Sequence, residues 1–227
     1  MNDIVISNLN YSYYNRVKNT STKALTNLIR EEEVLVFNKP VFHDTTLAGR
    51  IGFVGEWWSN DYAMNIKIKE LFSEYRGSRR YTHLLKMFDM DENKLISGIS
   101  KGEKKKVQIM VNIIKRKDIY IFDEATESLD LISRKLLLEF LRKESEKHNC
   151  IIIYSTHIFD YIQGWCSHIL YLSNGSVAFF SDIGSVTSAK NYVSLADHIF
   201  ENMMRETREK EKEKGLTLDD LLRTDSE

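Results

Sequence analysis

Two short apolar runs constrain the fold of this chain more than any other feature of its sequence. Residues 119–122 (Ile-Tyr-Ile-Phe) and 151–154 (Ile-Ile-Ile-Tyr) carry no charged side chain, which is typical of strands that are buried on both faces. Each run follows a segment with helical periodicity and leads into another, so the two runs form βα units. Because consecutive βα units join parallel strands, the sequence predicts an α/β fold with a central, mostly parallel sheet.

Local periodicity predicts further elements around this sheet. Strands are expected at 3–14, 34–37 and 50–54, and a hairpin is expected to join 169–172 to 177–180 through the turn residues 173–176. Helices are expected over 22–30, 66–75, 79–88, 101–116, 131–147 and 191–214, with shorter ones at 157–163 and 216–222.

The composition excludes several classes of protein. A net charge of −1 gives no global field that would attract nucleic acid or an anionic membrane. No apolar run approaches the roughly 20 residues of a membrane-spanning helix. The first 30 residues lack the apolar segment of a signal peptide. We therefore expect a cytoplasmic or nuclear protein without a membrane span, and the net charge does not indicate a nucleic-acid partner.

An acidic pair follows the first apolar run. Asp123 and Glu124 stand at the carboxyl end of the expected strand, where open α/β sheets bind their ligands. In phosphoryl transfer, one such acid holds Mg²⁺ through water and the next polarises the attacking water. The alternative is that both acids are merely solvated at a boundary between strand and loop.

Two further positions suit phosphate chemistry. His157 follows the second apolar run, and an imidazole there can donate to a phosphate that gains charge. The alternative is that Thr156 caps a helix and that His157 follows this cap without a functional role. Ser100 and Gly102 begin a helix and can present a hydroxyl and amides to an anion. Ser100 with Glu103 also fits the capping box S-x-x-E, and both interpretations can hold together.

The order of these segments resembles the ATP-binding-cassette (ABC) family. Residues 99–103 (Ile-Ser-Lys-Gly-Glu) resemble the ABC signature, and Phe122-Asp123-Glu124 resembles the end of Walker B. Ser128-Leu129-Asp130 resembles the D-loop, and His157 the switch histidine. Asp123 follows Ser100 by 23 residues, and His157 follows Asp123 by 34, which fits the family.

This resemblance implies a reduced P-loop NTPase fold. The nucleotide-binding domain would span residues 1–185, with a small helical subdomain at about 62–116, and a helical extension would occupy 186–227. Within the family, the chain resembles the soluble, non-transporter branch related to the fungal ABC protein associated with the CCR–NOT complex. The segments that carry this likeness are 54–57, 102–108, 138–141 and 156–160.

The chain has no Walker A motif. That motif, G-x-x-x-x-G-K-[ST], curls the backbone around phosphates and adds a lysine charge. Here the first of ten glycines is Gly49, and none of the ten precedes a lysine. The remnant is residues 19–22 (Asn-Thr-Ser-Thr), where Ser21 could offer Mg²⁺ a hydroxyl or could simply help to cap a helix. Glu56 stands near the position of the Q-loop glutamine, and Tyr13 is the best-placed aromatic for adenine stacking.

The resemblance implies ATP and Mg²⁺ as cofactors and a head-to-tail dimer as the working unit. A homodimer would have two incomplete sites, whereas in a heterodimer Ser100 and Gly102 could complete a partner's site. Three hypotheses remain open: a regulatory or interaction subunit without catalysis, a weak ATPase that uses Asp123, Glu124 and His157, and an RNA- or ribosome-associated factor. The third rests on the charged runs 104–106 and 205–214, which also suit solvated faces.

Overall fold

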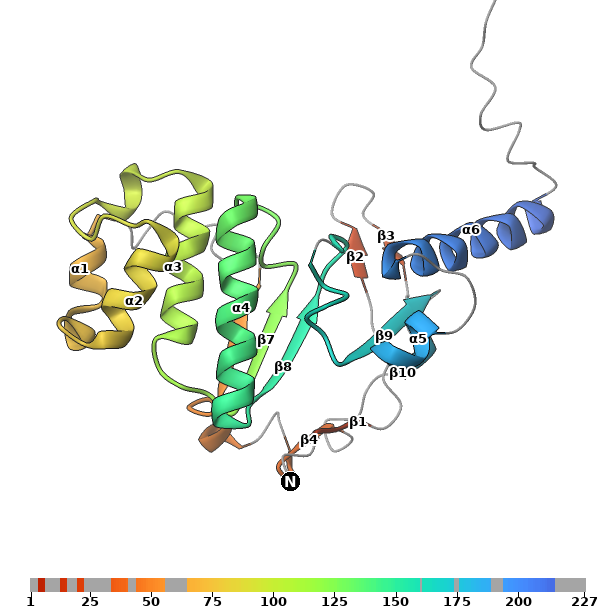
Figure 1. The fold of residues 1–227 in the computed structure, drawn as a ribbon, viewed down its shortest axis with the longest axis horizontal. Coiled ribbons are helices and arrows are strands. Elements are labelled where there is room, and N and C mark those ends of the chain that lie inside the picture. The colour runs from red at the N-terminus through yellow and green to blue at the C-terminus, as the bar shows by residue number, and fades with distance from the viewer. Residues whose placement is uncertain are drawn as a thin grey trace, which may run out of the picture. The chain divides into compact units, whose positions relative to one another are not determined.

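The fold comes from a computed structural model (Figure 1). It describes residues 4–6, 13–15, 20–22, 34–40, 44–55, 65–159, 161–173, 176–188 and 194–214. The chain divides into two compact units: one comprises Met1–Ile158 and Asn174–Ser176, and the other Phe159–Ser173 and Val177–Glu227. The division at Ile158 lies earlier in the chain than the domain boundary expected at residue 185.

The first unit contains the predicted parallel sheet. Strands β6 (Ile51–Val54), β7 (Ile119–Asp123) and β8 (Ile151–Ser155) lie in the order β6-β7-β8, and both pairings are parallel. In the register, Ile119 lies between Ile51 and Ile151. Both apolar runs therefore form neighbouring strands, which confirms the α/β prediction.

Four helices lie in the described residues of this unit. They are α1 (Ile68–Leu71), α2 (Arg79–Phe88), α3 (Lys101–Ile113) and α4 (Leu131–His148), with short 3-10 turns at Thr45–Leu47, Ser73–Tyr75 and Ile96–Gly98. The sheet buries Tyr120 and Phe122, while α3 buries Met110 and α4 buries Leu137 and Leu141. Burial of these apolar surfaces drives the helices and the sheet together.

Short antiparallel strands come before the sheet in the sequence. Strand β4 (Val34–Val36) pairs with β1 (Ile4–Ile6) and with β5 (Lys39–Pro40), while β2 (Tyr13–Asn15) pairs with β3 (Thr20–Thr22). The helix expected over 22–30 is wrong at its first residue, because Thr22 is part of β3. The rest of that segment lies outside the described residues.

The second unit contains the predicted hairpin and a long helix. Strands β9 (His168–Ser173) and β10 (Ser176–Asp182) form a two-stranded sheet, followed by α5 (Ile183–Ser188) and α6 (Leu195–Lys214). The helix expected at 157–163 is wrong, since its described residues form a bend and turns. The expected helix over 216–222 lies outside the described residues. None of the described helices is both long and apolar enough to span a membrane.

Candidate functional site

The site begins at the last residue pair between β7 and β8. Asp123 and Ser155 are opposite each other in the parallel register, and the Ser155 hydroxyl donates to Asp123 Oδ1 at 2.6 Å. The same hydroxyl oxygen accepts a hydrogen bond from the backbone N–H of Glu124 at 3.2 Å. Ser155 therefore fixes both the Asp123 carboxylate and the start of the following loop.

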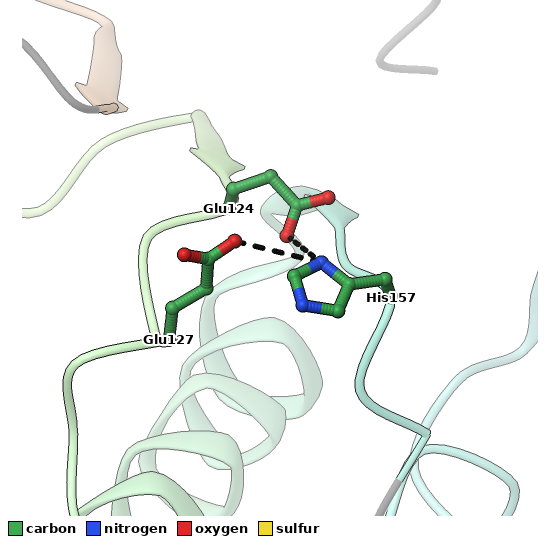
Figure 2. Close-up of side chains that lie close together, drawn as sticks. All are labelled: Glu124, Glu127 and His157. Atoms are coloured by element: carbon green, nitrogen blue, oxygen red, sulfur yellow. Dashed lines mark hydrogen bonds and ion pairs between the residues drawn. The ribbon is translucent and has the colours of Figure 1, made fainter.

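Glu124 has an unusual backbone conformation. Its φ of 46° lies in the left-handed region, which is uncommon for residues other than glycine and indicates a conformation that the surroundings impose. In this conformation the Glu124 carboxylate lies beside His157, with Oε2 3.0 Å from Nδ1. Glu127 Oε1 approaches the same nitrogen at 3.5 Å (Figure 2).

The loop after β7 is anchored to the sheet. Thr126 is buried, and its hydroxyl is hydrogen-bonded to the hydroxyl of Tyr154 on β8. The backbone N–H of Leu129 donates to the Thr126 carbonyl at 3.1 Å, which closes a turn. Glu124 and Glu127 therefore stand on a loop whose buried residues are held in place.

The start of α3 is a complete capping box. Ser100 Oγ accepts from the Glu103 N–H at 3.2 Å, and Glu103 Oε2 accepts from the Ser100 N–H at 2.9 Å. Glu103 also pairs with Lys94 at 2.9 Å. The hydrogen bond from Lys94, followed by those from Ser100, lowers the pKa of Glu103 to about 2. The cap that the sequence predicted is present, and Ser100 remains exposed.

The segment at 128–130 contacts α3. A Cβ atom at Gly102 would lie 2.9 Å from the Ser128 carbonyl oxygen, so the two backbones can approach this closely only with glycine there. Lys106 Nζ forms an ion pair with Asp130 Oδ2 at 2.9 Å. Asp130 also caps α4 by accepting from Ser133 N at 2.8 Å. The backbone hydrogen bond from Ser133, followed by the bond from Lys106, lowers the pKa of Asp130.

A backbone carbonyl at the end of β6 accepts two bonds from α3. Buried Gln108 donates through Nε2 to the Gly55 carbonyl at 2.9 Å, and Lys105 Nζ donates to the same oxygen at 2.9 Å. These bonds fix the chain just before Glu56, which itself lies outside the described residues.

The predicted site residues therefore fall into three places. Asp123, Glu124 and His157 meet at the carboxyl edge of β7 and β8, as expected. Ser100, Gly102 and Asp130 lie where α3 meets the start of α4. Tyr13 and Ser21 lie on the paired strands β2 and β3, so the backbone at Ser21 is extended instead of leading into a helix. The side chains of these two residues lie outside the described part of the chain.

Two residues of the edge cluster were missed from the sequence. Ser155 is detectable only once the parallel register sets it opposite Asp123. Glu127 lies three residues after Glu124, but only the loop conformation turns both carboxylates toward His157. The strand ends predict which segments lie close together, whereas the loop geometry decides which side chains of those segments contact each other.

Comparisons with known proteins find relatives in sequence and in fold. Residues 18–127 match the family model described as "ABC transporter". The chain is 31% identical over 202 residues to "ABC transporter I family member 20" of Arabidopsis thaliana, covering 82% of this chain and 62% of that protein. It is 30% identical over 141 residues to "CCR4-associated factor 16" of Saccharomyces cerevisiae, covering 59% of this chain and 48% of that protein. The matched part is therefore less than two thirds of either relative.

Solved structures show the same fold. An "ATP binding subunit of ABC transporter" superposes with a TM-score of 0.61 at 21% identity, over 74% of this chain and 75% of the other. A dimeric ATP-binding cassette in a post-hydrolysis state, bound to ADP and Pi, superposes with a TM-score of 0.60 at 19% identity, over 80% of this chain and 99% of the other.

Proposed function

We infer that this chain belongs to the ABC family of ATP-binding domains, and we propose that it is a regulatory or interaction subunit whose own nucleotide site is incomplete. One observation carries the proposal: none of its ten glycines precedes a lysine, so the sequence contains no Walker A motif. Without that motif the chain keeps the segment that resembles the signature but lacks the loop that binds phosphates in the family.

The residues present do not fit Mg²⁺–ATP in the manner of the family. Asp123 could hold Mg²⁺ through water, but its carboxylate already accepts a bond from Ser155. Ser21, the remaining candidate at the phosphate end, lies in an extended strand paired with Tyr14. Each charge-assisted hydrogen bond lost with the Walker A amides and lysine costs about 1.5–3 kcal/mol. Since about 1.4 kcal/mol is tenfold in affinity, losing several bonds lowers ATP affinity by orders of magnitude.

The residues at the start of α3 support a contribution to a second chain. Ser100 is exposed at a helix N-terminus, where backbone amides and the helix dipole favour an anion. In the family, each nucleotide lies between one chain's Walker motifs and the other chain's signature. The similar solved cassette is dimeric. We propose that Ser100 and Gly102 complete the nucleotide site of a Walker A-bearing partner in a heterodimer.

The likeness to CCR4-associated factor 16 suggests where such a partner belongs. That relative shares 30% identity over 141 residues with this chain, and its name links it to a CCR4-containing assembly. We propose a protein partner in a CCR–NOT-like complex, with the protein acting in the cytoplasm or the nucleus.

A weak ATPase is the second candidate function. The contact between Glu124 and His157, 3.0 Å from Oε2 to Nδ1, favours it because this pair occupies the position of a general base and its hydrogen-bonding partner. Tyr13 and Ser21 would then belong to a phosphate and adenine site built differently from the family pattern.

Isothermal titration with ATP and Mg²⁺ distinguishes the two functions. The regulatory proposal predicts millimolar or weaker binding to the isolated chain and micromolar binding once a Walker A-bearing partner is added. Micromolar binding by the chain alone, with turnover that Glu124→Gln abolishes, would instead establish the ATPase. Ser100→Glu should abolish only the binding that depends on the partner, because it adds a negative charge where the partner's phosphate would lie.

A further inference from the structure

We propose that Glu124, Glu127 and His157 form a binding site for one divalent transition-metal ion, with Zn²⁺ as its natural occupant. The three side chains converge beyond the carboxyl ends of β7 and β8 (Figure 2). Each offers one ligand atom, and these atoms lie within 4.8 Å of one another. The proposal does not depend on whether this chain binds nucleotide.

Two of the separations between ligand atoms are close to those of tetrahedral coordination. His157 Nδ1 lies 3.0 Å from Glu124 Oε2 and 3.5 Å from Glu127 Oε1. Zinc bonds of about 2.0–2.2 Å to nitrogen and oxygen place two tetrahedral ligands roughly 3.3–3.6 Å apart. The two distances to Nδ1 are thus close to this range, and the two carboxylate oxygens lie within 4.8 Å of each other. All three side chains are at least 41% exposed, which leaves a fourth position open to water.

A divalent cation between the three side chains suits this arrangement better than a proton on His157 Nδ1 does. One imidazole nitrogen carries at most one proton and donates one hydrogen bond at a time, yet two carboxylates face Nδ1 of His157. Two ionised carboxylates at this separation repel each other. A divalent ion between the three groups would pair with both charges at once and would accept the lone pair of the neutral imidazole.

The ligands stand on a backbone that is already ordered. Glu124 follows the last ladder pair, Asp123 and Ser155, and His157 stands two residues beyond Ser155 on the neighbouring strand. The backbone N–H of Glu124 is bonded to Ser155 through both its carbonyl and its hydroxyl oxygen. Because the sheet fixes the spacing of the two segments, binding an ion requires little reorganisation.

The donor set selects the class of ion. One imidazole nitrogen with two carboxylate oxygens suits Zn²⁺, Co²⁺ and Ni²⁺, whereas Mg²⁺ and Ca²⁺ prefer oxygen ligands throughout. Three protein ligands with one open position are also the pattern of zinc sites that keep a bound water. We therefore expect this site to prefer Zn²⁺ to Mg²⁺, the ion that accompanies ATP.

Titration of the full, tag-free chain with Zn²⁺ and Co²⁺ tests the proposal. A Cys166→Ser background removes a partly exposed thiol that could compete for the ion. We expect one ion per chain by calorimetry, a visible Co²⁺ absorption band typical of four-coordination, and Mg²⁺ affinity at least 100-fold lower. Glu127→Gln and His157→Gln should each weaken Zn²⁺ binding at least tenfold.

Matched controls separate a specific site from general charge effects. Glu139→Gln and His148→Gln alter the same residue types on α4, away from the cluster, and should leave Zn²⁺ affinity unchanged. Circular dichroism of every variant checks that the fold is intact. Zn²⁺ binding that is weaker than about 1 mM, or that Glu127→Gln and His157→Gln leave unaltered, would overturn the proposal. Neither result bears on ATP binding, so the regulatory function is tested separately.

Discussion

Gly102 on α3 lies directly against the backbone carbonyl of Ser128, where the signature-like segment meets the loop before α4. A Cβ built on Gly102 would stand 2.9 Å from that oxygen, a distance that real Cβ atoms essentially never show. Because the two backbones themselves lie this close together, rotating a side chain cannot relieve the contact.

Gly102→Ala should therefore destabilise the protein. Forcing a methyl group into a filled space typically costs about 1–3 kcal/mol, which thermal unfolding should detect as a lower Tm. Gly98→Ala is the matched control, because a Cβ there meets nothing within 4 Å. Equal Tm values for the two variants would contradict the close packing of Gly102 against Ser128.

The Arg80–Glu144 ion pair should be a main link between α2 and α4. Arg80 Nη1 and Nη2 each donate to the Glu144 carboxylate at 2.9 Å, and Arg80 Nε donates to the Ile113 carbonyl at 2.8 Å. Glu144 is 8% exposed. Arg80→Met leaves that buried carboxylate without its main partner and should cost about 3 kcal/mol in urea unfolding.

The double variant Arg80→Met/Glu144→Leu serves as the control for this pair. It removes both charges, so it should recover a large part of the loss seen in Arg80→Met. Simple addition of the two single effects would mean that the ion pair contributes no coupling energy.

Asp130 should stabilise the protein in two separable ways. It caps α4 through Ser133 N and pairs with Lys106. Asp130→Asn retains a side chain that caps well and loses only the charge, whereas Asp130→Ala loses both functions. We expect Asp130→Ala to cost about 1–2 kcal/mol in urea unfolding, with a clearly smaller loss for Asp130→Asn. Identical losses in the two variants would assign the whole effect to the ion pair.

Stability should fall in acid because of Glu103 and Asp130. The pKa of Glu103 is lowered from 4.5 to about 2, and that of Asp130 is lowered as well. A carboxylate whose folded pKa is depressed contributes stability above its unfolded pKa and loses it as pH falls through the folded value. The free energy of unfolding should thus hold between pH 7 and 5 and decline from about pH 4.5 toward 2. Glu103→Gln should flatten part of that decline.

Much of the fold could be predicted because each element carries its own local signals. Helix α2 begins after the Ser78 cap and α4 begins after the Asp130 cap, while α4 ends at Asn149 in the left-handed conformation. The apolar runs predicted the bounds of β7 and β8 to within one residue. Burial on both faces was wrong for β8: β7 is mostly buried, whereas β8 has no fully buried residue and its Ile153 is 41% exposed.

The errors have local physical causes. The helix expected at 157–163 depended on Thr156 as a cap, but its hydroxyl accepts from Ile158 N and donates to the Ile158 carbonyl, which closes a tight turn. Tyr161 then takes a positive φ of 65°, which no helix accommodates. At the site, Glu127 was missed because its position depends on the left-handed backbone at Glu124. The periodicity of apolar residues in the sequence does not predict the φ angle of a single residue.

The Lys106 side chain on α3 contacts both α2 and α4. Its ammonium group, carried by α3, reaches both Asp130 at the start of α4 and the Phe88 carbonyl at the end of α2. One ammonium group therefore ties both the end of α2 and the start of α4 to α3, and the start of α4 directly follows the loop that carries Glu124 and Glu127.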